Sequence, residues 1–457
     1  MTTNPLPLSR RRLLQGSAAL AAGAAGTTAL ASCGTVGAPA GATEIDYWLW
    51  DANQLPAYSA AIDMFMAENP DVYVRITQLG WDDYWTKLTA SFVAGAGPDA
   101  FADHLARFPE FVKLGVISPL EGLGELDALP ADHFKQGLQE LWTGQDGKRY
   151  GVPKDYDTIA VLYDKALLEE EGLSEDDLAS LDWNPEDGGS FERMLAHLTI
   201  DENGVRGDED GFDPKRVARY GLGADAGIDY VGQTTWSAFA FSTGWTFTDA
   251  ETWGTSFNYD DERFAATIDW YFGLVDKGFF PPFGMFGDSS PVQTQVQTGR
   301  AALGMAGSWM ISTWANLEGL ELGIAPLPTG PVGTPMSMFN GLGDSISAQS
   351  ENKDEAARLI GFLASDAAQQ AIGERAPFFP ATDVGTEAAV AAYADKGLDV
   401  TPFTDRVDAG ETGLYPLVEN SAAIASIMQA AFDQCWMRQI DGADFASYNE
   451  RVNALFR

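Results

Sequence analysis

Hydrophobic positions along this chain change repeatedly between the spacing of a strand and the spacing of a helix. Val72, Val74 and Ile76 alternate with polar or aromatic residues, and this period of two predicts a strand. Just before them, apolar side chains recur at positions 58, 62, 65 and 66, which predicts a helix that ends at Asn69-Pro70. The same two spacings predict extended segments at 44–50, 100–101, 150–164, 299–305 and 320–325, and helices at 84–92, 108–112, 165–171, 192–198, 264–278 and 354–372. Since strands alternate with helices, the pattern predicts an α/β fold in which sheets are covered by helices.

Loops that follow the predicted strands carry aromatic and acidic residues. Ligands of open α/β sheets bind beyond the carboxyl ends of the strands, where the loops near 50–53, 80–84 and 103–107 fall. Flat aromatic rings can stack on the apolar face of a sugar, while carboxylates, amides and guanidinium groups hydrogen-bond to its hydroxyls. The loops therefore predict a carbohydrate site. The alternative is that most of the 13 tryptophans pack in the core. Core positions are expected in particular for Trp48, Trp85 and Trp314.

The N-terminus has the order of an export signal. A basic region, Ser-Arg-Arg-Arg-Leu-Leu-Gln at 9–15, precedes an apolar run at 16–31 that is too short and rich in glycine for a spanning helix. The paired arginines indicate the twin-arginine route. Small residues lie before Cys33, which predicts removal of 1–32 and lipidation of Cys33; the alternative is a cleaved signal in which this cysteine is incidental. Residues 33–41 would then be a flexible tether, and the protein would sit on the outer face of the cytoplasmic membrane, held only by its lipid.

Charge and cysteine content narrow the class of protein. Asp and Glu number 66 against 28 Lys and Arg, and the formal net charge of −38 argues against a nucleic-acid partner and against binding anionic lipid through the protein surface. The remaining length exceeds that of a usual single domain, which predicts two domains. With Cys33 lipidated, no disulfide can form. Cys435 lies among apolar residues at helical spacing, so we expect it to be a buried small hydrophobic side chain.

No metal or cofactor is predicted. His104, His133 and His197 lack the spacing of zinc ligands. The acidic segment 201–213 faintly resembles a calcium loop but misses the full ligand pattern, so a solvated hairpin is the preferred interpretation, with calcium left open. The sequence has no Walker loop and no Gly-x-Ser-x-Gly motif, so ATP hydrolysis would belong to another subunit.

Five segments, in order, carry a family resemblance. The chain resembles extracellular solute-binding lipoproteins of carbohydrate ABC importers, of the maltodextrin-binding type. The resemblance covers nearly all the mature chain and lies in YWLWDAN, WDDYWTKLTASFVAGAGPDAF, YGVPKDYDTIAVLYDKALLEEEGL, GRAALGMAGSWMIS and FNGLGDSISAQSENKDEAARLIGFLASDAAQQ.

This resemblance implies a two-lobed periplasmic-binding-protein-like fold, each lobe a sheet flanked by helices, joined by hinge strands. Lobe one would comprise 42–153 and 345–380, and lobe two 158–340 and 381–457, with hinges at 152–158 and 340–345. A sugar would bind between the lobes, and the closed state would be read by the transmembrane subunits of an ABC permease with a separate ATPase subunit. The protein would be a monomer without a cofactor and without catalytic residues.

The resemblance also implies a set of sugar-contacting residues. They come from the loop after the first strand, the end of the third strand, the two crossings between lobes and the second lobe. The set is Trp50, Asp51, Asp103, His104, Arg107, Asp157, Gln233, Trp236, Trp309, Asn340, Asp344 and Tyr415. Asp103-His104 stand where the family often has an aromatic ring, which puts stacking at that position in doubt.

Two other functions remain open from the residues alone. An extracellular glycoside hydrolase would share the signal, the acidity and the tryptophans, and would need two carboxylates on either side of the scissile bond. A binder of a non-sugar polyol would share the same pocket chemistry. Release of a product from an oligosaccharide would separate the hydrolase from a binding protein.

Overall fold

The computed structural model describes residues 38–225, 227–287 and 290–457. The predicted signal at 1–32, the lipidation of Cys33 and most of the tether at 33–41 lie outside the described residues. Residues Gly41–Arg457 form one compact unit, described here by itself. Within the described part of the chain, no helix combines the length and apolar character that crossing a membrane requires.

The first sheet contains the N-terminal strands. Its order is β11-β4-β10-β3-β1-β2, with β12 beside β10. The strands are β1 (Thr43–Leu49), β2 (Val72–Gln78), β3 (Ala100–His104), β4 (Gly151–Asp157), β10 (Ser337–Ile346), β11 (Phe379–Pro380) and β12 (Thr412–Leu414). Strands β1, β2 and β3 are parallel, whereas β10 runs antiparallel to both β3 and β4. The carboxyl ends of β1 and β3 therefore meet at one edge of the sheet, as the sequence predicts.

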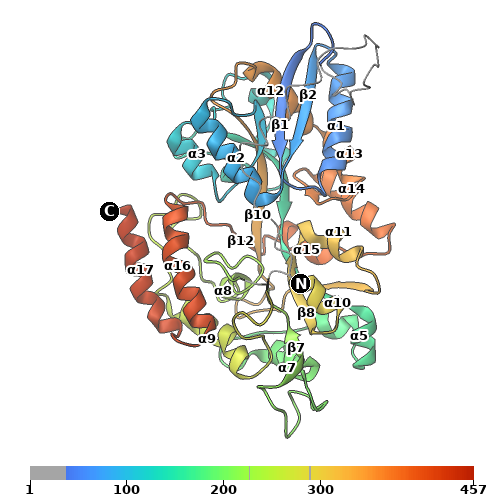
Figure 1. Ribbon diagram of the computed structural model, residues 1–457, viewed down its shortest axis with the longest axis vertical. Helices are drawn as coiled ribbons and strands as arrows, with labels where there is room; N and C mark the ends of the chain where they lie inside the picture. Colours follow the sequence, from blue (N-terminus) through green and yellow to red (C-terminus); the bar gives the residue numbers. More distant parts are fainter. Residues whose placement is uncertain (1–37, 226, 288–289) are drawn as a thin grey trace, which may run out of the picture. The chain divides into compact units, whose positions relative to one another are not determined.

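Helices cover this sheet (Figure 1). They are α1 (Leu55–Glu68), α2 (Trp81–Ala94), α3 (Phe108–Leu114), α12 (Lys353–Leu363), α13 (Asp366–Gly373) and α14 (Asp383–Ala394), with the short η1 (Gly124–Ala128), η2 (Ala131–His133) and α4 (Leu138–Leu141). Helix α1 turns the apolar side chains of Tyr58, Ile62 and Phe65 inward. This is the periodicity from which the helix was predicted.

The C-terminal part of this region differs from prediction in one helix. The single helix predicted at 354–372 is two helices, because Ser365 interrupts it: its side chain accepts a hydrogen bond from the Ala368 N–H and caps α13. Helix α14 packs on α13 and β11. A lobe boundary after α14 would keep these elements together, and the boundary at 380/381 stays a prediction.

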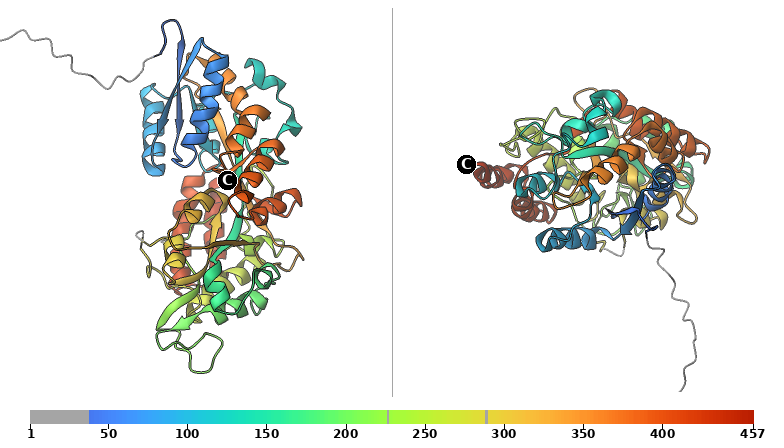
Figure 2. Two further views of the ribbon diagram at one scale, coloured as in Figure 1. Left: turned by 90° about the vertical axis from the view of Figure 1, so that its right-hand side faces the viewer. Right: turned by 90° about the horizontal axis from the view of Figure 1, so that it is seen from above.

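The second sheet has the order β6-β7-β8-β5-β9. Its strands are β5 (Ile159–Asp164), β6 (Ile200–Asp201), β7 (Val217–Leu222), β8 (Ala301–Gly307) and β9 (Leu322–Ala325). The helices of this part are α5 (Lys165–Glu170), α6 (Glu175–Ala179), α7 (Gly189–Leu198), α8 (Ser237–Phe241), α9 (Glu262–Asp276), α10 (Val292–Gln297), α11 (Ile311–Ala315), α15 (Thr401–Asp408), α16 (Ser421–Trp436) and α17 (Phe445–Asn453), with η3 (Ser308–Met310), η4 (Gly442–Asp444) and η5 (Ala454–Phe456). In the left view of Figure 2 the first sheet lies above the second, and the crossing strands run between them.

Two neighbouring strands carry the chain between the sheets. Strand β4 of the first sheet continues through Thr158 into β5 of the second. Strand β10 lies beside this crossing: Asn340 pairs with Asp157, and the Ile159 N–H donates to Ser337 Oγ at 2.7 Å. The crossing residue Thr158 is fully buried, and its hydroxyl donates to the Phe403 carbonyl at 2.7 Å. The predicted two-sheet α/β fold is confirmed, and the segments predicted as hinges are buried strands.

The core predictions hold at the named positions. Trp48, Trp85 and Trp314 are buried, and Cys435 is a buried free cysteine on α16. Burial raises the pKa of its thiol to about 12. A thiol in such surroundings stays protonated and behaves as an apolar side chain.

Candidate functional site

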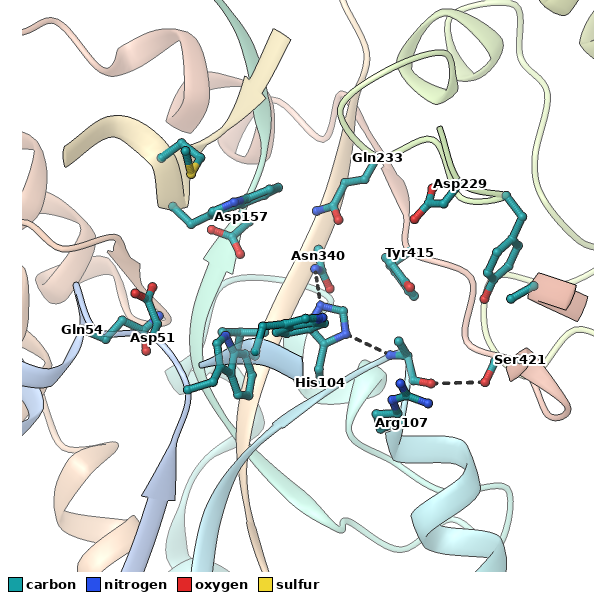
Figure 3. Close-up of a pocket in the computed structure, with 18 of the residues that line it drawn as sticks. Asp51, Gln54, His104, Arg107, Asp157, Asp229, Gln233, Asn340, Tyr415 and Ser421 are labelled. Atoms are coloured by element: carbon teal, nitrogen blue, oxygen red, sulfur yellow. Dashed lines mark hydrogen bonds between the residues drawn. The ribbon is translucent and has the colours of Figure 1, made fainter. Parts of the chain in front are cut away.

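A pocket of about 640 Å³ opens where the two sheets approach each other. Its walls come from elements far apart in the sequence: the loop after β1, the start of α2, the end of β3, the crossing strands, the turn after β8 and the start of α16 (Figure 3). The pocket therefore lies at the carboxyl edge of β1 and β3, the edge at which ligands of such sheets bind.

One wall of the pocket is aromatic. The ring of Trp50 lies 5.3 Å from that of Trp81 and 5.2 Å from that of Trp85, measured between ring centroids. Trp85 is buried and supports the cluster, whereas Trp81 is 45% exposed at the start of α2. Both Trp50 and Trp81 line the pocket. This wall offers flat apolar surface that is fixed in place from behind.

Trp309 lines the pocket from the other sheet and lies on a glycine. It is the middle residue of η3, directly after β8, and is half-buried. Gly307 lies beneath its ring, so closely that a Cβ atom at residue 307 would overlap the ring atoms. The backbone at Gly307 has φ −83° and ψ 158°, which any residue can adopt. The glycine is therefore required for space rather than for backbone freedom.

His104 is a fixed neutral side chain in the middle of the pocket. Its Nδ1 accepts a hydrogen bond from the Ala106 N–H at 3.0 Å, and its Nε2 lies 3.2 Å from the side-chain amide of Asn340. The Tyr415 ring meets the imidazole edge-on, with centroids 5.6 Å apart. Burial, with a further contribution from the nearby Arg107 guanidinium, lowers the pKa of His104 to about 4. The imidazole is therefore uncharged at neutral pH.

Carboxylates line the pocket at both ends. Asp157, 5% exposed at the end of β4, accepts a hydrogen bond from Ser308 Oγ at 2.9 Å. Asp51 accepts from the Asn53 N–H at 2.8 Å. Burial raises the pKa of both, and for Asp157 the charge of nearby Asp155 raises it further. At the other end, Asp229 accepts from the backbone N–H groups of Val231 and Gly232.

A second layer of charge lies behind the pocket. The Lys154 ammonium donates to Gln54 Oε1 at 3.0 Å and stands 4.0 Å from the centroid of the Tyr58 ring. Gln54 in turn donates to Asp155 Oδ2 at 3.1 Å. This buried chain holds the loop after β1 against β4. Lys154 itself is not part of the pocket lining.

The structure brings most of the predicted contact residues together. The pocket lining includes Trp50, Asp51, His104, Arg107, Asp157, Gln233, Trp309, Asn340 and Tyr415. Their contact with a sugar stays a prediction. Arg107 lies before α3, and its guanidinium carbon is 5.8 Å from the centroid of the Trp85 ring.

Three predicted residues lie outside the pocket, and their placement is corrected here. Asp103 is fully buried and accepts hydrogen bonds from the His104 N–H and the Ser345 hydroxyl. Asp344 is buried and accepts from the Tyr47 hydroxyl at 2.6 Å. Trp236 is buried in the core. Successive side chains of a strand point to opposite faces, so Asp103 points away from the face that His104 presents to the pocket. Asp344 shares the face of Asn340 and Leu342 but lies further along β10, where Tyr47 binds it in the interior.

Other lining residues were not in the predicted set. They are Ala52, Asn53, Gln54, Trp81, Ala106, Asp229, Tyr230, Met310, Leu342, Ser421, Ala422, Ala425 and Gln429. Trp81 could have been found, since it starts the aromatic loop at 80–84. The contribution of α16 could not, because its small residues carry no local signal and reach the pocket only through the fold. Its first residue crosses the cleft: Ser421 Oγ donates to the Ala106 carbonyl at 3.1 Å.

In the acidic segment at 201–213, the first carboxylate stabilises the loop. Asp201 is buried, and its oxygens accept hydrogen bonds from the backbone N–H groups of Asn203, Val205 and Asp213. These bonds close the loop on itself. Over the described part of the chain, no group of three or more His, Cys, Asp or Glu side chains is arranged to hold a metal ion.

Stability is expected to fall as pH rises above neutrality. Burial raises the pKa of Asp103 to about 8 and that of Asp155 to about 7. Since both groups ionise near 3.8 when unfolded, the folded state holds more protons, and this stabilisation is lost as pH rises through the folded pKa values. The free energy of unfolding should drop by about 1–3 kcal/mol between pH 6.5 and 8.5, less a small opposing contribution from His104, which is neutral in the folded state but half protonated at pH 6.5 when unfolded. Urea unfolding at three pH values measures it. Asp103→Asn should flatten the slope, and an unchanged slope in this variant would contradict the assignment.

Comparisons with known proteins agree with this architecture. The profile of the bacterial extracellular solute-binding protein family matches residues 60–405. A galactooligosaccharide-binding protein of Bacillus subtilis is 24% identical over 365 residues, which is 75% of each chain. Among solved structures, M. tuberculosis UspC superposes with a TM-score of 0.72 at 23% identity, covering 91% of this chain and all of that one. The GacH receptor of Streptomyces glaucescens, solved unliganded and with acarbose, has a TM-score of 0.71 at 20% identity and covers 91% and 98%. The family match spans most of the sequence and confirms the resemblance: this chain belongs to the bacterial extracellular solute-binding proteins.

Proposed function

We propose that this protein is the substrate-binding component of an ABC importer and that it captures a sugar or an oligosaccharide outside the cell. The observation that carries the proposal is the pocket itself. Trp50 and Trp81 on one side and Trp309 on the other offer flat apolar faces, while Arg107, Gln233 and Asn340 offer hydrogen-bonding groups between them. Such a combination suits a ring with apolar C–H faces and a rim of hydroxyls. Relatives that bind galactooligosaccharides or acarbose support the choice of a sugar.

Closure of the cleft would report the bound sugar to the permease. The ligand would touch residues beside both sheets at once, for example Trp50 and Trp309, and so would favour the arrangement that brings them together. The chain passes between the sheets at Thr158 and beside it in β10, and small rotations there would move one part against the other. ABC permease partners, with a separate ATPase subunit, are expected for this family.

The family places the protein on the extracellular or periplasmic side. We further propose that the protein is exported by the twin-arginine route, that residues 1–32 are removed and that Cys33 carries a lipid. Residues 33–41 would form a flexible tether. Through it the protein, as a monomer, would reach a permease in the same membrane. Membrane fractionation of a Cys33→Ala variant tests the anchor: release of the protein from the membrane is expected. Retention would contradict it.

Sugar binding without conversion is the expected outcome of a thermal-shift screen. A ligand that binds only the folded state stabilises it, by about 2.7 kcal/mol when its concentration is a hundred times its Kd. The unfolding temperature rises as a result. The purified protein should be screened against mono- and oligosaccharides and polyols, and the ligand then recovered and analysed by chromatography. Saturable stabilisation with unaltered sugar supports the proposal. A cleaved oligosaccharide would indicate a glycoside hydrolase, and stabilisation only by linear polyols would exclude a sugar.

A further inference from the structure

The charges that line the pocket are unequal and unevenly placed. Within the part of the chain that the structure describes, the lining carries the carboxylates Asp51, Asp157 and Asp229 and a single cationic side chain, Arg107. Figure 3 shows Asp51 and Asp157 on one side of His104, and Arg107 and Asp229 on the other. One end of the pocket therefore has one carboxylate and one cation, and the other end has two carboxylates and no basic residue in its lining.

The two carboxylates at the acidic end have capacity left for a ligand. Asp157 is 95% buried, and its Oδ1 atom accepts the hydrogen bond of Ser308 Oγ; its Oδ2 atom makes no hydrogen bond with the described residues. The Asp51 carboxylate accepts from the Asn53 N–H through Oδ1, and hydrogen bonding from the Gln54 N–H also lowers its pKa, which leaves part of its acceptor capacity for a ligand. Each residue thus presents a carboxylate oxygen to the same end of the pocket.

The nearest lysine does not supply the missing positive charge. Lys154 donates to Gln54 and lies against the Tyr58 ring. Its positive charge acts on the buried carboxylates of Asp155 and Asp344. It is not among the residues that line the pocket. Its single charge opposes the rise in the pKa of Asp51 and Asp157, but it is shared with the two buried carboxylates Asp155 and Asp344.

Aromatic rings next to these carboxylates also favour a cation. Trp50 directly precedes Asp51, and Trp309 directly follows Ser308, the hydrogen-bond partner of Asp157. Tryptophan faces attract ammonium groups through the ring quadrupole. Hydrogen bonds from a charged donor to a carboxylate are about twice as strong as neutral ones. A neutral hydroxyl would hydrogen-bond to the carboxylates at this end but would not balance their charge. An acidic group would be repelled by them.

We propose that the end of the pocket formed by Asp51, Asp157 and their neighbouring tryptophans binds a protonated amine on the sugar, so that the protein prefers amino sugars to neutral sugars and rejects sugar acids. This inference rests on the proposed sugar-binding function. Binding of the amine would displace a proton from the acidic end, where Asp157 faces Asp51, Asp155 and Lys154.

Matched sugars that differ only in charge test the proposal. The purified protein should be titrated at pH 7, by calorimetry, with glucose, glucosamine, N-acetylglucosamine and glucuronate, with the galactose counterparts, and with cellobiose, its diamino analogue and N,N′-diacetylchitobiose. We expect the amine to bind at least about tenfold more tightly than the neutral parent and its N-acetyl form, and the acid to show no binding. Amine binding should release protons, seen as a heat that depends on the ionisation enthalpy of the buffer.

Variants locate the effect within the pocket. Asp157→Asn keeps the acceptor for Ser308, and Asp51→Asn keeps the acceptor for Asn53; either should reduce the amine-to-neutral ratio to near unity. Asp225→Asn, which removes a carboxylate outside the pocket lining, should leave the ratio unchanged.

Equal affinities for amine and neutral sugars, tight binding of the acid, or a ratio insensitive to Asp157→Asn and Asp51→Asn would overturn the proposal and leave sugar binding intact. Failure of every sugar to bind would overturn the proposed function as well.

Discussion

Replacing Gly307 with alanine is expected to weaken sugar binding about as much as removing the Trp309 ring altogether. A Cβ at residue 307 would occupy the space of that ring, so the indole must leave the pocket wall for the variant to fold. Truncation of a stacked aromatic anchor typically costs about 1–3 kcal/mol of binding, or about 5- to 150-fold in Kd. Gly307→Ala and Trp309→Ala should both show this loss by isothermal titration with the best ligand of the screen.

A second glycine provides the matched control. Gly273 lies in α9, and a Cβ there would meet no atom within 4 Å. Gly273→Ala should bind sugar like the wild type and be slightly more stable, because alanine favours a helix over glycine by about 1 kcal/mol. Trp309→Phe should retain part of the affinity. Wild-type affinity in both Gly307→Ala and Trp309→Ala would mean that the ring does not contact the ligand.

Trp236→Ala is expected to destabilise the protein strongly without a direct effect on the ligand. The indole is fully buried, stacked on Phe432 at 5.2 Å and packed edge-on against Phe264 at 5.3 Å and Trp245 at 5.7 Å. Its Nε1 donates to the Asp229 carbonyl. Cavities left by Trp→Ala in a core cost about 3–5 kcal/mol. Urea unfolding followed by circular dichroism measures this loss.

The two tryptophan variants should show opposite patterns. Under conditions where Trp236→Ala remains folded, its Kd for the best ligand should stay within about threefold of the wild type, because its ring is not part of the pocket wall. Trp309→Ala should lose affinity and keep nearly all of its stability. A Trp236→Ala protein that is stable but unable to bind sugar would restore the original prediction that this residue contacts the ligand.

The contrast between these residues shows what the sequence could and could not predict. Periodicity located β2 and α1, and burial of Trp48 and Trp85 followed from their places in predicted elements. Trp236 and Trp309 look alike locally, since each lies beside small and polar residues. What separates them is tertiary: Trp236 meets Phe432, almost 200 residues away, while Trp309 has a glycine beneath it and open space above.

Position along a strand explains why Asp344 does not reach the pocket. The sequence correctly brought β3, β4 and β10 to the site, and in β10 the resemblance placed both Asn340 and Asp344 at the ligand. Asn340 faces the pocket, but Asp344 is bonded to Tyr47 in the interior. The two residues share one face of β10, because they are four residues apart and β10 pairs with β3 in regular register; the irregularity at Leu342 and Gly343 lies in β4, where Lys154 is the extra residue. What separates them is the distance along the strand from the edge of the sheet, and the spacing of the sequence does not show where the pocket ends.

A crystal structure of the protein with the best ligand of the screen tests the central claim most directly. The account predicts density for an intact sugar in the pocket between the two sheets, with one ring face against Trp309 and hydrogen bonds to groups beside both sheets, among them Asp157 and Arg107. A sugar bound instead in the separate cavity lined by Phe241, Trp245 and Leu414, with the pocket at Trp309 holding only solvent, would contradict it.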